Sequence, residues 1–579
     1  MSSEDFGYMH VADYVIFLGT LVISVAIGVY FAFADGGQKT TKQFLLGDRN
    51  MPVLPTALSL MVSFLSGILV LGISSEMYMK GTNFIFHVFG MLVALPIAAI
   101  VYLPIFYKLK LTSAYEYLEM RYESQAIRLI GSTLFVISTV LYMAIVMYAP
   151  ATALNGLTGI NLELLIAVSG ILCTFYTAIG GLKAVVWTDA FQALIMYAGF
   201  IAIVLQGTIQ VGGVGKVWAI ASEGGRLVAS FDPNPFTYMT VWSSVIGTAF
   251  GWVATYTTNQ TAVQRYTSVS SLRKAQLSLF LVLPGMLTMM PLVCMVGIVM
   301  YAYYANCDPL VLGKIKNRDQ LLPYFTTDVL ADFPGTTGLF LACLYSGTLS
   351  TISSGLNSIA AVVWTDFIQP TAYGSRIADN RATQLNKAIA CAFGFIAIGF
   401  ACVAQHLGGV LQASMTILSA GALVGVVGSS AVMCCIAAST HFIKPYQSNL
   451  VQSIIGCSNE TLLAAGFNSS QALISVTSAP DVELTGILYV LKLSFKYYGT
   501  AGILLVFLFG APISIITSKF KVNTAAAALM WPGLGKICCC LLPAAMVQEM
   551  EKVDGIKERI EMTSRKIVPV QQPIYITQV

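Results

Sequence analysis

Apolar runs of about 20 residues recur along almost the whole chain, which is the length that an α-helix needs to cross a bilayer core of about 30 Å. Only 10% of the residues are charged, whereas soluble proteins carry roughly 25%, so the chain does not cover itself with charge. The short alternating segments typical of a membrane β-barrel do not appear. The sequence therefore predicts an all-α membrane protein.

Twelve candidate membrane segments follow one another without an intervening soluble domain. They are residues 15–33, 54–77, 84–107, 129–150, 162–179, 190–210, 241–258, 276–304, 338–363, 388–405, 411–440 and 499–517. We expect a transmembrane unit over residues 1–520 and a cytoplasmic tail over 521–579. The net charge of +4 is too small to indicate a nucleic-acid partner, and no residue spacing indicates a nucleophile–base pair or a metal site, so an enzyme is not expected.

The charges of the loops predict an orientation. The loops after odd-numbered segments, including those with Lys183 and Arg265, carry fourteen lysines and arginines, and the loops after even-numbered segments carry six. Because lysine and arginine accumulate on the cytoplasmic side, the N-terminus is predicted to be extracellular. Lys519 and Lys521, after the last segment, favour a cytoplasmic C-terminus.

Two segments contain more small and polar residues than a lipid-facing helix needs. The second holds serines and glycines between Ser59 and Gly72, and the seventh holds glycines and threonines up to Asn259 and Gln260. Interrupted helices in matching places of two halves are typical of a transporter site, because unwound carbonyls can coordinate Na⁺. Small residues that permit close helix packing are the alternative.

The ninth segment carries a polar stripe. Its polar residues recur at helical spacing: Ser346, Ser350, Ser353 or Ser354, and Asn357. Hydroxyl oxygens suit a hard monovalent cation without placing a full negative charge in the membrane. Alternatively, each serine bonds the carbonyl four residues earlier and the stripe serves packing.

At this point the chain resembles the sodium:solute symporter family, in the branch of sodium-coupled monocarboxylate, multivitamin and iodide transporters. The resemblance rests on LTSAYEYLEMRY (111–122), YTAIGGLKAVVWTDAFQ (176–192), NQTAVQRY (259–266), DQLLPYF (319–325) and YSGTLSTISSGLN (345–357). It implies an inverted five-plus-five helix repeat with about 12–13 transmembrane helices. The repeats are expected at about 54–210 and 241–440.

The resemblance also implies a sodium site between the broken second helix and the ninth. Its expected ligands are the main-chain carbonyls of Val62 and Leu65, followed by Gly347, Ser350 and Thr351. Asp189 resembles an acidic residue linked to sodium binding or release on the intracellular side. An interfacial ion pair, with a partner such as Lys183, is the alternative for Asp189.

Family resemblance assigns the substrate cavity to Phe64, Leu69, Tyr142 and Trp252, for which the alternative is plain helix-bundle core. Leu69 stands where related transporters commonly carry a polar residue, which indicates a more apolar contact. No cationic residue of the core helices awaits a carboxylate. Recognition of an anion is therefore expected to rest on Tyr142, Trp252 and bound Na⁺.

The region after the tenth segment departs from the family. Residues 412–439 resemble the start of one family helix joined to the next, as if one helix were missing. The loop after this eleventh segment should be cytoplasmic by alternation, yet it carries the glycosylation sequons of Asn459 and Asn468, which have meaning only outside the cell. Either the eleventh segment is re-entrant, or the chain is an isoform that lacks a helix. Cys307 and Cys457 match extracellular family cysteines, and the resemblance implies a disulfide between them. The last residues, Thr577–Val579, fit a ligand for a PDZ domain.

The functional hypothesis is a sodium-driven plasma-membrane symporter for a small organic solute, most simply a monocarboxylate. It needs Na⁺ as coupling ion and no other cofactor. Within the same class, a multivitamin or anion symporter is the alternative. From a different class, the shortened 411–440 region and the PDZ-like tail suit a non-transporting solute sensor or scaffold.

Overall fold

The computed structural model describes residues 10–34, 38–315, 317–330, 332–404, 436, 439–440, 443, 449–465, 481–506 and 508. These residues form helices and short helical turns and no β-sheet, apart from one isolated bridge between Met51 and Val269. Within the described ranges, seven helices are long and apolar enough to cross a membrane, or eight if one bent pair counts as a single span. The predicted all-α membrane architecture is therefore confirmed.

Each predicted segment up to residue 405 contains described helices. The spans are α1 (Val11–Phe33), α3 (Val53–Val62) with α4 (Gly67–Lys80), α5 (His87–Ile97) with η4 (Ala98–Tyr102) and α6 (Leu103–Leu109), α8 (Gln125–Thr158), α9 (Leu162–Val211), η5 (Ser243–Gly247) with α11 (Thr248–Thr258), α13 (Leu272–Tyr304), α15 (Thr336–Val362) with η7 (Val363–Ile368), and α16 (Asp379–Ala404). Segment 411–440 and the tail 521–579 lie almost wholly outside the described residues.

The long helix α9 holds two predicted segments. Its 50 residues would extend about 75 Å if straight, far more than one bilayer crossing requires. Gly181 interrupts it with φ 57° and ψ −158°, a backbone conformation essentially open only to glycine. The carbonyl of the adjacent Gly180 accepts a hydrogen bond from Gln38 at 2.6 Å, next to α2 (Thr41–Leu46), while Val211 leads into α10 (Val214–Glu223) at the other end of the molecule. The chain therefore turns back at Gly181.

The predicted interruption of the second segment is present. Helices α3 and α4 meet at a bend of 57°, and residues 63–66 between them are not helical. Ser66 begins α4 as its N-cap, with its hydroxyl oxygen accepting a long hydrogen bond from the Leu69 amide at 3.4 Å. The bend leaves backbone carbonyls outside the regular helical ladder, in the middle of the protein.

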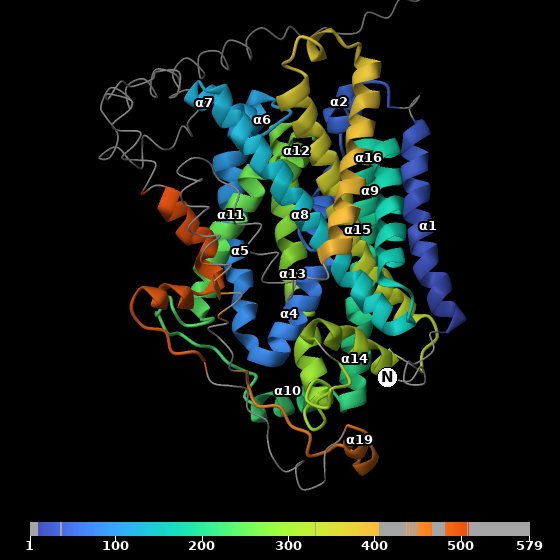
Figure 1. Ribbon diagram of the computed structural model, residues 1–579, viewed down its shortest axis with the longest axis vertical. Coiled ribbons are helices and arrows are strands. Elements are labelled where there is room, and N and C mark those ends of the chain that lie inside the picture. The colour runs from blue at the N-terminus through green and yellow to red at the C-terminus, as the bar shows by residue number, and fades with distance from the viewer. Residues whose placement is uncertain are drawn as a thin grey trace, which may run out of the picture.

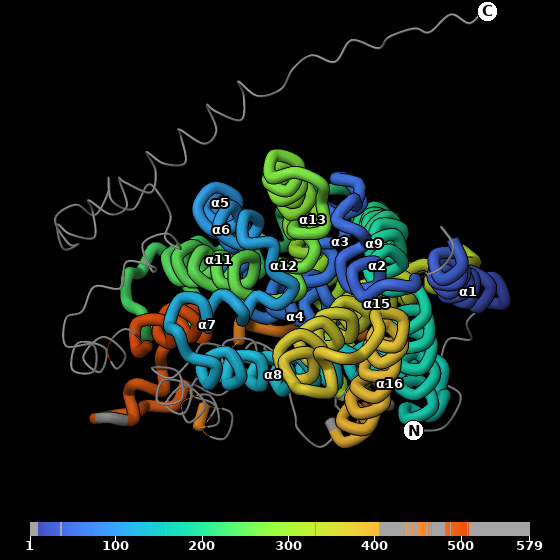
Figure 2. The backbone as a smooth tube through the Cα atoms, turned by 90° about the horizontal axis from the view of Figure 1, so that it is seen from above, coloured from blue at the N-terminus to red at the C-terminus, as the bar shows by residue number. Residues whose placement is uncertain are grey.

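The two ends of the helix bundle carry different short helices (Figure 1). One end carries α10, α14 (Leu321–Leu330), α19 (Asn459–Ala464) and the disulfide between Cys307 and Cys457, and we call it the disulfide face. The other end carries α2, α6 and α7 (Glu116–Tyr122), and we call it the opposite face. Seen along this direction, α1 is peripheral, while α3, α4, α12 (Gln260–Thr267) and α15 lie toward the centre (Figure 2).

The central helix α15 is almost entirely buried. In a bilayer, water does not drive helices together, so close van der Waals packing between small residues has to do much of this work. Gly28 of α1 illustrates it: an added Cβ would lie 2.5 Å from the Cβ of Tyr176 on α9. This tight packing joins α1 to α9.

Candidate functional site

The break between α3 and α4 lies directly against α15. A Cβ on Gly347 would lie 2.9 Å from the Leu65 carbonyl oxygen and 3.1 Å from the Gly67 nitrogen, so only glycine lets the two backbones approach this closely. The Val62 carbonyl accepts a hydrogen bond from the Leu65 amide at 3.1 Å and keeps its second lone pair. The structure thus brings Val62, Leu65 and Gly347 together.

Thr351 connects α15 to the same break. Its hydroxyl donates to the Ser63 carbonyl at 3.1 Å and lies 2.9 Å from the Gly347 carbonyl, one turn earlier in its own helix. Ser350 is fully buried, yet its hydroxyl has no hydrogen-bond partner among the described residues. An unpaired hydroxyl at this depth is costly, and a cation between the helices would satisfy it.

Asp189 lies on α9 at the side of this site and is fully buried. One carboxylate oxygen, Oδ2, accepts from the Ser59 hydroxyl at 2.5 Å and from Arg265 Nη2 at 3.2 Å. The other oxygen, Oδ1, has no partner within the described part of the chain. The Ser350 hydroxyl is close enough to interact with this carboxylate, although not in the geometry of a regular hydrogen bond. Two poorly paired buried oxygens therefore lie together between α9 and α15.

Arg265 is the residue that the sequence assigned wrongly. It was expected in a cytoplasmic loop, but it is fully buried in α12 and forms the ion pair with Asp189. Its Nε donates to Ser59 at 2.7 Å and its Nη1 to the Thr261 carbonyl at 2.9 Å, and Nη2 also contacts the Ser354 hydroxyl. Asp189 thus forms an ion pair, as the alternative expected, but with Arg265 instead of Lys183 and in the interior instead of at the interface.

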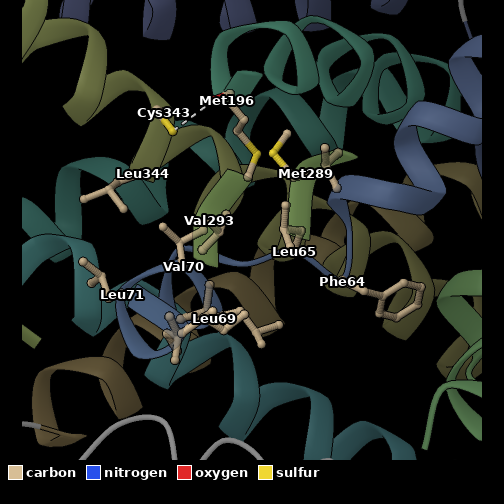
Figure 3. Packing of buried hydrophobic residues seen from close by; sticks show 14 of the residues in the cluster. Phe64, Leu65, Leu69, Val70, Leu71, Met196, Met289, Val293, Cys343 and Leu344 are labelled. Carbon is tan, nitrogen blue, oxygen red and sulfur yellow. Dashed lines mark hydrogen bonds between the residues drawn. The ribbon is translucent and has the colours of Figure 1, made fainter. Parts of the chain in front are cut away.

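The predicted substrate residues divide into two groups around the break. The Phe64 ring packs edge-to-face on Trp252 and Tyr256, with centroids 6.3 and 5.4 Å away, and Trp252 stacks on Tyr256 at 5.5 Å. Figure 3 shows the Phe64 ring pointing away from Leu65 and Leu69, although all three belong to the same buried apolar cluster. We call Phe64, Trp252 and Tyr256 the aromatic wall; Tyr256 is a member that the sequence did not single out.

Tyr142 and Leu69 lie on the other side of the break. The Tyr142 hydroxyl is 3.1 Å from the Ser66 hydroxyl, so it contacts the N-cap of α4. Leu69 is buried one turn into α4. The four residues assigned to the cavity thus gather around the break. Phe64 and Leu69 lie in it or one helical turn beyond it, Tyr142 of α8 contacts Ser66, and Trp252 of α11 packs on Phe64.

At the disulfide face, Cys307 and Cys457 are joined, with Cα atoms 4.9 Å apart. Asn459 is the first residue of α19, directly after this bridge, and Asn468 lies outside the described residues. Asp308 lies next to the bridge and accepts a hydrogen bond from Tyr78 at 2.6 Å. Burial raises the pKa of Asp308, and the Tyr78 hydrogen bond opposes that rise.

The central arrangement suits a monovalent cation that must bind and leave. Its oxygens are backbone carbonyls and hydroxyls, and its one nearby carboxylate is already offset by Arg265. No cluster of three or more histidine, cysteine, aspartate or glutamate residues that could hold a transition metal occurs in the described ranges. The same neutral oxygens are typical of sodium sites at discontinuous helices.

Sequence comparison points in the same direction. A family model described as sodium:solute symporter family matches residues 44–435. The chain is 39% identical to human sodium-coupled monocarboxylate transporter 1 over 548 residues, 89% of each protein. It is 36% identical to the human sodium/iodide cotransporter, covering 92% of this chain and 87% of that one. It is also 36% identical to the sodium-dependent multivitamin transporter of Oryctolagus cuniculus, covering 91% and 86%. These relatives are transporters, not enzymes.

Comparison with solved structures identifies the fold. A Na⁺-coupled sialic acid symporter, described in a substrate-bound outward-open state, aligns with a TM-score of 0.70. The alignment covers 90% of this chain and 99% of that one at 23% identity. The predicted fold class, that of sodium-coupled carriers with an inverted helix repeat, is therefore confirmed.

Proposed function

The chain belongs to the sodium:solute symporter family, and from this premise we propose that it couples Na⁺ entry to the uptake of a small monocarboxylate by alternating access. The observation that carries the proposal is the break between α3 and α4, packed against the hydroxyl face of α15 with the Ser350 hydroxyl unpaired. A sodium ion at this place would be shared by two elements that move relative to each other during transport.

The proposed sodium ligands are neutral oxygens around the break, with one acidic residue beside them. They are the carbonyls of Val62 and Leu65, Gly347, and the hydroxyls of Ser350 and Thr351, with Asp189 at the side. Thr351 donates to the Ser63 carbonyl at 3.1 Å. Rotation of that hydroxyl hydrogen away from Ser63 would turn its oxygen toward the ion, so binding needs little rearrangement.

The proposed substrate lies along the aromatic wall, with Leu69 and Tyr142 on the other side of the break. Rings and an aliphatic side chain favour a short hydrocarbon chain, which gains about 0.8 kcal/mol per buried CH₂. The 39% identity to a monocarboxylate transporter supports this substrate class. The 36% identity to iodide and multivitamin transporters makes inorganic anions and vitamin carboxylates the competing candidates.

The sodium gradient is sufficient for such uptake. A tenfold gradient supplies about 1.4 kcal/mol, and a potential of about −60 mV adds about 1.4 kcal/mol per charge. One sodium ion could therefore concentrate a neutral solute about 100-fold, and a monocarboxylate anion about tenfold, because the potential does no net work when one sodium ion moves with one anion.

We further propose a plasma-membrane location with the disulfide face outside. The loop charges assign this side to the exterior, and the disulfide with the adjacent Asn459 sequon suits an oxidising compartment. Glycosylation at Asn459 and Asn468, and capture of Thr577–Val579 by a PDZ domain, belong to the same proposal.

The experiment is uptake of a radiolabelled panel by cells expressing the full chain, in Na⁺ and in choline. The panel is lactate, pyruvate, butyrate, nicotinate, biotin and iodide. Sodium-dependent butyrate or lactate uptake is the expected result. Iodide or biotin uptake that monocarboxylates do not compete with would show that the substrate is not a monocarboxylate. Binding of a solute without any flux would make the chain a sensor.

A further inference from the structure

The aromatic wall continues toward the disulfide face through a histidine. Trp252 donates its indole N–H to His87 Nε2 at 2.9 Å. Because an indole nitrogen can only donate, Nε2 must be the acceptor, and the proton of the neutral ring is on Nδ1. That N–H has an acceptor, the Thr248 hydroxyl at 2.8 Å. His87 is thus buried and neutral, with the role of both ring nitrogens determined.

An ammonium group is positioned beside this histidine. Lys496 lies on η10 (Phe495–Tyr497), and its Nζ is 3.2 Å from His87 Nδ1 and 3.6 Å from the centroid of the Phe84 ring. Since Nδ1 carries a proton, it cannot accept from the ammonium. Ring faces attract the cation but leave its three N–H donors without a strong acceptor.

No carboxylate of the described chain compensates this charge by direct contact. Glu76 of α4 acts on Lys496 from a distance, but the two do not form an ion pair, and Glu76 Oε1 has no hydrogen-bond partner within the described ranges. A buried cation without a hydrogen-bonded anion is expensive. The Lys496 ammonium is therefore a hydrogen-bond donor without a bound anion, close to the aromatic wall.

The backbone that carries Lys496 is held in place by tight packing against neighbouring segments. The Ser494 amide donates to the Pro235 carbonyl at 3.0 Å, and its hydroxyl donates to the Tyr238 carbonyl at 2.6 Å. A Cβ on Gly247 would lie 2.2 Å from the Lys496 carbonyl oxygen, so only glycine admits η10 here. These contacts fix η10 against the start of the α11 span.

A cavity of about 330 Å³ lies next to this region, at the disulfide face. Its lining includes Lys80, Asn83 and Tyr238. Tyr238 connects it to η10, because its ring packs on Phe495 at 5.5 Å, and Lys80 lies 4.8 Å over the same ring.

We propose that Lys496 binds the carboxylate of the transported acid, at the outer end of the aromatic wall. This inference rests on the proposed function, which supplies a monocarboxylate as substrate. The acid's two oxygens accept from the ammonium, while its hydrocarbon chain lies along Trp252 toward Phe64. The subsite is distinct from the proposed sodium ligands, which lie at the break between α3 and α4 and on α15.

The test compares carboxylate and amide recognition. Sodium-dependent uptake of labelled butyrate is measured in cells expressing the wild type, Lys496→Met, Lys496→Arg and Lys496→Cys, with unlabelled butyrate or butyramide as competitor. Half-saturating concentrations are used because they do not depend on the amount of protein at the surface. Lys216→Met, on exposed α10 of the same face, is the control for loss of one positive charge.

We expect Lys496→Met to raise the half-saturating butyrate concentration at least about 30-fold, the loss typical of truncating one partner of a buried charge pair. Competition by butyramide should not change, Lys496→Arg should retain the preference for butyrate, and Lys216→Met should match the wild type. In Lys496→Cys, attachment of an aminoethylthio group by a methanethiosulfonate reagent should restore butyrate affinity, whereas a methylthio group should not.

The outcomes separate this inference from the proposed function. If the wild type shows no sodium-dependent monocarboxylate uptake, the proposed function fails and the inference with it. If the wild type transports butyrate and Lys496→Met keeps the wild-type preference for butyrate over butyramide, the inference alone is overturned.

A pH series gives a second readout. Burial lowers the pKa of Lys496 to about 7, against the charge of Glu76, while His87 stays neutral through its Trp252 bond. The ammonium is populated below that pKa, so half-saturating butyrate should rise as external pH increases from about 6 to about 8. Lys496→Arg should remove this dependence, because a guanidinium remains charged over the whole range. A Lys496→Arg profile identical to that of the wild type would contradict the assignment.

Discussion

Replacing Ser350 by alanine should weaken sodium binding without weakening the fold. Ser350 is fully buried in α15, and its hydroxyl has no hydrogen-bond partner among the described residues. Its removal breaks no regular hydrogen bond, only an interaction with the Asp189 carboxylate, and it removes a poorly paired buried hydroxyl, whose cost is about 1–3 kcal/mol. Alanine is also the best helix former. The thermal midpoint of the sodium-free protein should therefore stay the same or rise.

The loss in sodium affinity follows from removing one oxygen from a charged ligand. Hydrogen bonds to charged groups are worth about 1.5–3 kcal/mol, and a lost sodium–hydroxyl contact should be of similar size. Since about 1.4 kcal/mol corresponds to a factor of ten, half-saturating Na⁺ should increase roughly 10- to 150-fold. Maximal uptake at saturating Na⁺ should fall much less.

Ser358→Ala is the matched control on the same helix. Ser358 is equally buried, but its hydroxyl accepts from Thr261 at 3.0 Å and lies 2.8 Å from the Ser354 carbonyl. Its removal should cost about 1–2 kcal/mol of stability by leaving the Thr261 hydroxyl without this partner. Sodium activation should remain that of the wild type. Ser350→Ala should thus lower sodium affinity and keep stability, whereas Ser358→Ala should lower stability and keep sodium affinity.

The assay is butyrate uptake as a function of Na⁺, with choline as replacement and surface biotinylation for normalisation. Thermal unfolding of the detergent-solubilised protein without sodium measures stability. Wild-type Na⁺ activation in Ser350→Ala would refute its role as a ligand. A drop in stability equal to that of Ser358→Ala would refute the unpaired state of its hydroxyl.

Three further outcomes are expected. Asp189→Asn should destabilise the protein by about 3–5 kcal/mol because it leaves the Arg265 charge uncompensated, and adding Arg265→Met should recover part of the lost thermal midpoint; a double mutant no better than Asp189→Asn would contradict this. Uptake in the wild type should rise from acetate to butyrate, and Leu69→Thr should shift preference toward the shorter acid; an unchanged ratio of acetate to butyrate uptake would exclude Leu69 from the cavity. Glycosidase should shift the mobility of the wild type but not that of Asn459→Gln with Asn468→Gln, and labelling of a tag in this loop only after permeabilisation would place it inside the cell.

Sequence patterns were sufficient for features that depend on neighbours along the chain. Apolar run lengths predicted the spans, and the glycines and serines of the second segment predicted its interruption, because each reflects how a local stretch meets the bilayer. The family motifs around Ser350 placed a candidate site on α15. These predictions needed no knowledge of which helices touch.

Pairings across the fold could not be predicted in the same way. Asp189 and Arg265 are far apart in the sequence, and nothing local to Arg265 distinguishes a loop arginine from a buried one. Counting it among the loop charges was reasonable but wrong, because an ion pair and contacts with Ser59 and Ser354 keep it in the interior. Lys496 precedes the last predicted segment, so its proximity to Trp252 through His87 depends on packing of η10 that the sequence does not reveal.

The pairing of Asp189 with Arg265 also affects what an electrode should record. Because the arginine offsets the carboxylate, a movement of this pair without a bound ion would shift little net charge, so transient currents should report bound sodium. Over a complete cycle the charges of the protein return to their starting places, and one sodium ion moving inward with one monocarboxylate anion carries no net current. Each additional sodium ion would carry one elementary charge across the membrane. Current measured together with tracer flux would count the coupling ions directly.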